Sequence, residues 1–306
     1  MLWVSRFRLT LNQMLFRSRW STWVQLLPAL LIITFVFLIP LVQLFAVSLW
    51  EYDPTGVLRA TDPTAENYLK YLQQPFYRQV ITRTLRLGFI TSTVCLLLAY
   101  PLAYILARMN FKHKSLLMFL LITPLFVSVV VRVFGWIVIM DREGVVNYVL
   151  QALHITKQPL RILKTEYAVV VGLVNVLLAF MVMPIYSSLE SIRPSLEEAA
   201  QTLGASPIKA WLRVTLPLSI PGVLAGWTLA FIMTLSSYVQ PSVLGGPSYF
   251  VMATVLRSQI TGALNWPMAA ATGFTLLAIG LVAVYVPVYL IRRVFSANLE
   301  EGSNRG

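Results

Sequence analysis

Residues 194–217 read PSLEEAAQTLGASPIKAWLRVTLP, a polar stretch between two long apolar segments. Pro194 disfavours the α conformation in the residue before it, so a preceding helix should stop there. Ser195 then predicts the N-cap of a new helix, and Glu198 three residues later would complete a capping box. Gly204 lies where a glycine commonly ends a helix. The stretch therefore predicts a short helix that starts at Ser195 and ends before Gly204.

A second short helix is expected after a sharp turn at Gly204. Ser206 followed by Pro207 is typical of an N-cap and a first helical position, and Pro217 is expected to end this helix. Helical spacing places one set of apolar residues on a shared face of the first helix: Leu196, Ala199, Ala200 and Leu203. The apolar face of the second helix consists of Ile208, Trp211 and Leu212. Because a loop cannot bury both faces by itself, the pair predicts a partner with a receiving groove.

The same stretch resembles the cytoplasmic loop in the permease subunits of binding-protein-dependent ABC importers. The pattern of that family is Glu-Ala-Ala, three residues, glycine, nine residues and then Ile-x-Leu-Pro. The matching positions here are Glu198, Ala199, Ala200, Gly204, Val214, Leu216 and Pro217, with valine in place of isoleucine. The competing interpretation is an ordinary amphipathic helix pair between two spans. The resemblance implies contact with an ATPase through Glu198, Ala199, Ala200, Leu203, Gly204, Ile208, Trp211 and Pro217.

Composition indicates a polytopic membrane protein. Of 306 residues, 58% are hydrophobic and only 12% are charged, which is too apolar for a soluble domain of this length. The net charge of +12 is typical of basic cytoplasmic loops that meet anionic lipid, so nucleic-acid binding is not expected. The single cysteine, Cys95, cannot form an internal disulfide. His113 and His154 are far apart, so no metal site is expected.

Apolar segments predict an all-α integral membrane fold with six transmembrane helices, as in type I ABC importers, and with the 194–217 loop between spans four and five. The expected spans cover about 24–49, 86–107, 116–140, 167–189, 220–239 and 267–291. Pro241 and the cluster at Gly245–Pro247 are expected to end span five and start an external or re-entrant segment. The basic residues fit cytoplasmic N- and C-termini.

Three segments follow from these spans. Residues 1–23 form a basic arm, which is either a surface helix on the membrane or a disordered tail. Residues 24–293 form the transmembrane domain, and residues 294–306 form a cytoplasmic tail. The family resemblance is strongest over 66–292.

The sequence has no nucleotide-binding or hydrolytic signature. It lacks the Walker A pattern, HExxH, GxSxG and paired carboxylates in a plausible cleft. The chain is therefore not expected to be an enzyme or to hold a cofactor. The resemblance implies that ATP and Mg are bound by a separate cytoplasmic ATPase dimer. It further implies a second permease subunit, identical or different, an extracytoplasmic solute-binding protein, and a place in the bacterial inner membrane.

Arg132 is the only charge well inside an apolar run, and it should face the bundle interior or water because it is costly in lipid. The surrounding residues 131–136, with Gly144 and Asn147, resemble the third span of spermidine/putrescine-type and opine-type permeases. Arg132, Trp136, Tyr186 and Tyr238 are the candidates for the translocation path. Alternatively, Arg132 pairs with Asp141 or Glu143, or extends to the outer surface. Those two acids are also candidates for external contacts.

The sequence indicates the transported solute less well than it indicates the class of transporter. A polyamine path should offer carboxylates or aromatic faces, yet no Asp or Glu falls inside an expected span. Polyamine-like amines stay the first candidate, and opines or amino-acid-derived solutes the second. A stand-alone carrier or channel is the alternative from another class, and it would predict midplane ionisable residues and inverted repeats.

Overall fold

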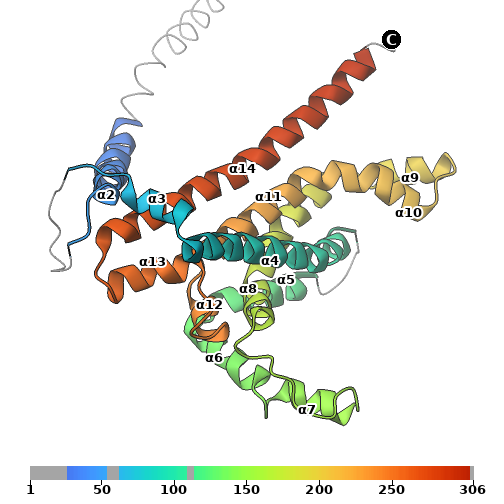
Figure 1. Ribbon diagram of the computed structural model, residues 1–306. Coiled ribbons are helices and arrows are strands. Elements are labelled where there is room, and N and C mark those ends of the chain that lie inside the picture. Colours follow the sequence, from blue (N-terminus) through green and yellow to red (C-terminus); the bar gives the residue numbers. More distant parts are fainter. Residues whose placement is uncertain (1–25, 54–61, 109–113, 304–306) are drawn as a thin grey trace, which may run out of the picture.

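The computed structural model describes residues 26–53, 62–108 and 114–303, and every regular element in these parts is a helix (Figure 1). Within these described ranges, five helices are long and apolar enough to cross a membrane, or six if one bent pair counts as a single span. The predicted all-α membrane fold is therefore confirmed. The basic arm predicted for 1–23 lies outside the described residues.

Three long helices form the centre of the bundle: α4 (Pro75–Arg108), α8 (Glu166–Ser191) and α11 (Leu216–Ser236). α8 is the most buried span, as expected for the helix between the other two. Two glycines four residues apart, Gly222 and Gly226, let α11 approach it closely. A Cβ at Gly226 would lie 3.0 Å from the carbonyl oxygen of Met181 on α8. Small residues at this spacing are a common contact between membrane helices.

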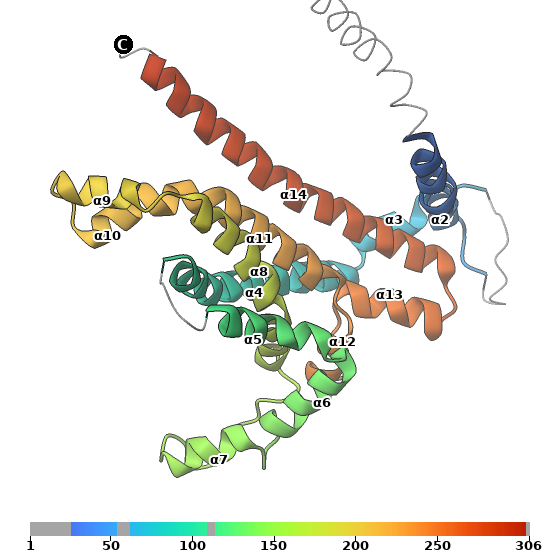
Figure 2. The ribbon, with the colours of Figure 1, turned by 180° about the vertical axis from the view of Figure 1, so that it is seen from behind.

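A second group of helices packs beside this centre. It contains the π-helix η1 (Ile33–Leu38), α2 (Ile39–Ser48), α3 (Glu66–Gln73), α13 (Met252–Thr261) and α14 (Trp266–Ser303). Figures 1 and 2 both show α2, α3 and α13 at one end of α14. The centroids of the Phe45 ring on α2 and the Phe274 ring on α14 lie 5.1 Å apart. The helix expected near Ala65–Leu72 is present as α3. α14 runs on to Ser303, so it includes most of the predicted tail 294–306.

Span three is broken, which corrects the prediction of one helix over 116–140. α5 (Lys114–Phe126) and the segment Val129–Ala152, which begins with α6 (Val129–Met140), meet at a bend of 100°. Ser128 between them has an extended ψ of 135°, so the helix cannot continue through it. After α6, the short α7 (Val145–Ala152) leads away from the bundle (Figure 2). The apolar run alone concealed this bend because both halves are hydrophobic.

The end of span five also differs from its predicted place. α11 ends at Ser236 rather than near 239, because Ser237 takes an extended ψ of 126°. Pro241 does not divide the chain but lies inside the short α12 (Val239–Leu244). The glycine cluster does act as a break, since Gly246 has a φ of +81° and no helix continues through it.

Candidate functional site

The 194–217 loop projects from one end of the molecule as a rigid turn between α9 (Ser195–Thr202) and α10 (Pro207–Ala210) (Figure 1). Gly204 has a φ of +91°, which L side chains rarely adopt. Its N–H donates to the Gln201 carbonyl at 2.9 Å, and the N–H of Ala205 donates to the Ala200 carbonyl at 3.0 Å. These two bonds are the Schellman pattern of a helix end. The predicted helix end and sharp turn at Gly204 are confirmed.

The two helix starts differ in how well they were predicted. Ser206 caps α10 as expected, since its Oγ accepts a hydrogen bond from the Lys209 N–H at 3.4 Å. The capping box of Ser195 and Glu198 is wrong. Pro194 already has helical angles, and its carbonyl accepts from Glu198 N–H at 3.2 Å, so the helix starts one residue early. Glu198 lies exposed on α9.

Pro217 does not end the second helix. α10 continues through the π-helical turn η2 (Trp211–Thr215) into α11, and the three form one element from Pro207 to Ser236. Proline is tolerated in the first turn of a helix. Because proline has no N–H, the carbonyl four residues before it receives no hydrogen bond, and the wide π-helical turn leaves room for this carbonyl. The loop is consequently joined to span five without a hinge.

The expected unpartnered apolar face is present at the tip of this loop. Leu203 is 89% exposed and Ile208 is 70% exposed, and Leu196 and Leu212 are exposed as well. Trp211 is different, because its ring is half-buried and meets the Tyr100 ring of α4 edge to face at 5.7 Å. The loop therefore presents leucine and isoleucine outward, while tryptophan holds it to the bundle.

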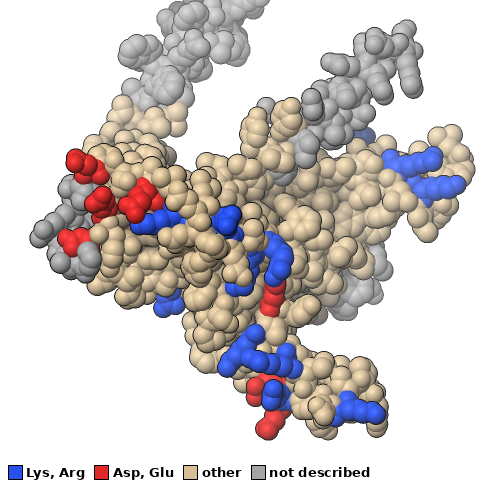
Figure 3. Space-filling view, viewed as in Figure 1, with Lys and Arg blue, Asp and Glu red and all other residues tan. Residues whose placement is uncertain are grey.

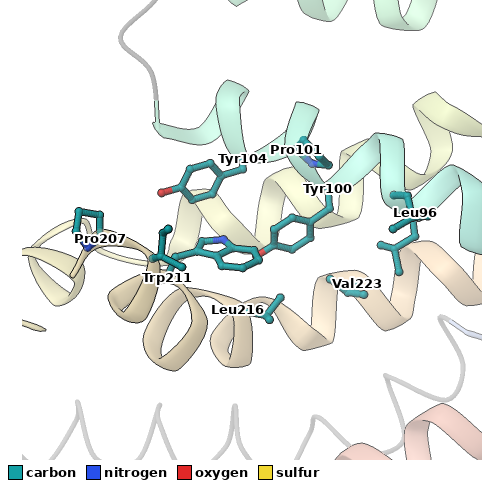
Figure 4. Close-up of a pocket in the computed structure, with 10 residues that line it drawn as sticks. Leu96, Tyr100, Pro101, Tyr104, Pro207, Trp211, Leu216 and Val223 are labelled. Carbon is teal, nitrogen blue, oxygen red and sulfur yellow. The ribbon is translucent and has the colours of Figure 1, made fainter. Parts of the chain in front are cut away.

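A cavity of about 640 Å³ lies behind the loop, between α4 and the element formed by α10, η2 and α11 (Figure 4). Tyr100, Tyr104 and Trp211 lie along it in Figure 4, and its lining is almost wholly apolar. The Tyr100 hydroxyl and the Ser219 hydroxyl form a hydrogen bond of 3.0 Å between α4 and α11. The loop thus contacts α4 as well as the two spans that it joins.

Sequence reasoning missed Glu197, the residue before the family pattern. One Oε of Glu197 lies 2.8 Å from Arg108 Nη2 and 2.5 Å from Thr215 Oγ1, and the other accepts from the Tyr104 hydroxyl at 3.4 Å. Arg108 also donates to the Ile192 carbonyl at 2.8 Å. The sequence does not distinguish the adjacent residues Glu197 and Glu198. Only their positions on α9 show that Glu197 faces the bundle and Glu198 faces outward.

Arg132 lies on the side of α6 that packs against the bundle, in register with Val133 and Trp136. Its Nε and Nη1 atoms are buried and have no hydrogen-bond partner in the described part of the chain. Among the same residues, no ion pair joins it to Asp141 or Glu143, which are both exposed. The described residues thus show no ion pair of Arg132 with Asp141 or Glu143, and its place in the translocation path stays a prediction.

Tyr238 lines a second cavity of about 230 Å³, which also touches Val129 at the start of α6, one turn before Arg132. The Arg257 guanidinium lies over the Tyr238 ring, 4.9 Å from its centre. Tyr186 lies apart from this region, because it contacts Glu190 and Lys114 near the far end of α8. The cavity thus links Tyr238 to the start of α6, whereas Tyr186 lies apart from it. The role of these residues and of Trp136 in a translocation path stays a prediction.

On the outer side of the bend, Asn147 organises the segment after α6. This fully buried side chain donates to the carbonyls of Asp141 and Leu160 at 3.0 Å each and accepts from the Leu160 N–H at 2.8 Å. The three bonds hold the chain around Asp141 and Glu143 in a defined shape. Whatever contacts these acids therefore meets an ordered surface.

A broken-helix bundle with a projecting helix pair between two spans is the architecture of a membrane transport subunit. Residues 99–296 match the family described as "Binding-protein-dependent transport system inner membrane component", and the chain belongs to this family. It is a multi-pass inner-membrane permease subunit of a transport system.

Named relatives of the chain include polyamine permeases. It is 36% identical over 253 residues to the spermidine/putrescine transport system permease protein PotB of Haemophilus influenzae, covering 82% of this chain and 88% of the relative. It is 35% identical over 245 residues to the protein of the same name from Escherichia coli, covering 80% and 88%.

Among solved structures, it is similar to a bacterial ABC transporter involved in the import of the acidic polysaccharide alginate. The TM-score is 0.68 at 19% identity, with 94% of this chain and 99% of that chain covered. This likeness concerns the fold and confirms the ABC importer architecture.

Proposed function

We propose that this chain forms the translocation pathway of an ATP-driven importer and receives its energy through the 194–217 loop. The observation that carries the proposal is the pair Leu203 and Ile208, exposed at 89% and 70% on a turn that the positive φ of Gly204 permits and two backbone hydrogen bonds close. An apolar tip of this kind requires a protein groove. The loop then lies in the cytoplasm, and both termini lie on the same side.

The charge distribution supports this orientation. In the view of Figure 3, the charged side chains that are visible at the end carrying α9 and α10 are basic, whereas acidic and basic side chains are mixed around α7. The first turn of α9 also carries Glu197 and Glu198. Basic residues next to spans are typical of the cytoplasmic side.

The proposed partners follow from the two ends. A dimer of cytoplasmic ATPases, which binds ATP and Mg, takes the exposed tip of the loop. A second permease subunit, identical or different, completes the pathway. A solute-binding protein meets the outer end near Asp141 and Glu143. A structural relative was solved in complex with an alginate pentasaccharide-bound periplasmic protein, which supports this arrangement. In this proposal the chain itself holds no cofactor.

The proposed cargo is a polyamine-like amine, because the two relatives described above are spermidine/putrescine permeases that match most of the chain. A carboxylate-bearing amine, such as an opine, is the second candidate. It is favoured by the buried guanidinium atoms of Arg132 without a partner in the described residues, since a carboxylate would satisfy them.

The test expresses the chain with the neighbouring genes of its operon in cells without polyamine uptake. Uptake of radiolabelled spermidine and uptake of radiolabelled octopine are measured in parallel. Spermidine uptake supports the first cargo, and octopine uptake without spermidine uptake supports the second. Proton-driven uptake by this chain alone in liposomes would overturn the importer assignment in favour of a stand-alone carrier.

A further inference from the structure

One partly buried cluster joins the loop to the bundle through charged and polar groups. Its centre is the Arg108–Glu197 ion pair, with Nη2 and Oε1 2.8 Å apart and with side chains only 12% and 15% exposed. Arg108 is the last residue of α4, and Glu197 lies in the first turn of α9. The cluster therefore connects a span that is distant in sequence to the first helix of the loop.

Further hydrogen bonds extend the cluster to two more elements. Thr215, the last residue of η2, donates to the same Oε1 of Glu197 at 2.5 Å. Arg108 donates to the carbonyl of Ile192, the C-cap of α8, at 2.8 Å. The ends of α4 and α8 and the starts of α9 and α11 thus meet at one carboxylate and one guanidinium.

The geometry of these contacts determines how a displacement of the loop is transmitted to α4. The other contacts between α4 and the loop that line the cavity of about 640 Å³ are largely apolar, and apolar surfaces can slide past each other. A hydrogen-bonded ion pair with low exposure is directional, and separating it leaves charges without partners in a poorly hydrated place. The cluster is consequently the stiffest connection between α9 and α4.

We propose that Glu197 is a positioning residue that transmits the movement of the 194–217 loop, from here on called the coupling loop, into α4. This inference rests on the proposed function, because it assumes that an ATPase moves the loop. In this view, displacement of α9 moves α4 through Arg108 at the same time as it moves α8 and α11 through the chain. Glu198, one residue later, faces outward and belongs to the docking surface instead.

The chain offers a matched control in a second ion pair near the same end of α8. Lys114 at the start of α5 lies 3.3 Å from Glu190 of α8, with side chains 33% and 54% exposed. It also joins two spans, but water screens it, and within the described residues it makes no hydrogen bond or ion pair with α9. Glu190→Gln therefore removes a similar charge without removing the proposed connection.

The experiment follows α4 directly and needs no cargo. Because Cys95 is the only cysteine, Cys95→Ala provides a background in which Ile105→Cys, exposed near the end of α4, is the single labelling site. The complex with its ATPase is purified, and maleimide labelling rates are compared without nucleotide and with ATP plus vanadate. The same measurement is made with Glu197→Gln, Thr215→Val and Glu190→Gln, alongside the amount of ATPase that co-purifies.

We expect the labelling rate at position 105 to change with ATP plus vanadate in the background protein and in Glu190→Gln. In Glu197→Gln the ratio of the two rates should return to about one, with the same amount of bound ATPase, because coupling and docking are separate free energies. Thr215→Val should give an intermediate ratio. An unchanged ratio in Glu197→Gln would overturn the inference, as would loss of the ATPase in that variant, which would assign Glu197 to docking. If no ATPase co-purifies with the background protein, the proposed function itself is wrong.

Discussion

A Cβ atom at Gly222 of α11 would lie 2.4 Å from the Cβ of Ser188 on α8. No real side chain tolerates this distance, so Gly222 is what lets the two spans that flank the coupling loop touch. The carbonyl oxygen of Pro184 would lie 2.7 Å from the same atom. The loop therefore connects two closely packed helices, so a displacement of the loop moves both spans together.

Replacing Gly222 with valine should separate α8 from α11 and destabilise the protein by about 1–3 kcal/mol, the usual range for overpacking. The measurement is the melting temperature in detergent. Gly280→Ala is the control, because a Cβ at Gly280 of α14 meets nothing within 4 Å. A control variant as unstable as Gly222→Val would contradict the packing explanation.

Replacing Gly204 with alanine should weaken ATPase binding through backbone strain alone. A Cβ there meets no atom within 4 Å, but the φ of +91° disfavours alanine by roughly 1–2 kcal/mol. Asparagine visits this conformation more readily, so Gly204→Asn should retain more ATPase in a co-purification assay. A larger loss in Gly204→Asn than in Gly204→Ala would show that side-chain size, and not φ, decides the effect.

Leu203→Asp and Ile208→Asp should each abolish co-purification of the ATPase without changing the melting temperature, because both side chains are mostly exposed and surface substitutions usually change stability by less than about 0.5 kcal/mol. Leu153→Asp is the matched control. Leu153 follows α7 at the opposite end of the molecule and is also exposed, so its variant should keep the ATPase. Retention of the ATPase by Leu203→Asp would place docking elsewhere.

Arg132→Gln should leave the melting temperature unchanged or raise it, since Nε and Nη1 lose no hydrogen bond to the described residues. A lone arginine at mid-bilayer costs about 2.5–3.5 kcal/mol on insertion scales. If the guanidinium binds a carboxylate of the cargo, octopine uptake should fall while spermidine uptake persists. Arg142→Gln, at an exposed position outside α6, is the control. A lower melting temperature in Arg132→Gln would instead indicate a structural partner.

The sequence could predict the loop and the spans because their signals are local. Gly204 and the Ser206–Pro207 pair decide backbone angles within a few residues, and the structure confirms both. The sequence did not predict the bend between α5 and α6, because both helices are apolar and the hydropathy profile shows no break at Ser128. Pro217 was read as a break because proline usually ends helices, whereas η2 absorbs the disruption here.

The sequence by itself determined the class of this protein: apolar spans and a helix pair with an apolar tip between two of them. These follow from composition and from short-range backbone preferences. Only the tertiary structure decided that Glu197 faces Arg108 while Glu198 faces outward, and that the Nε and Nη1 atoms of Arg132 are buried without a hydrogen-bond partner among the described residues. Such facts depend on residues that are far apart in the chain, and long-range packing alone brings them together or keeps them apart.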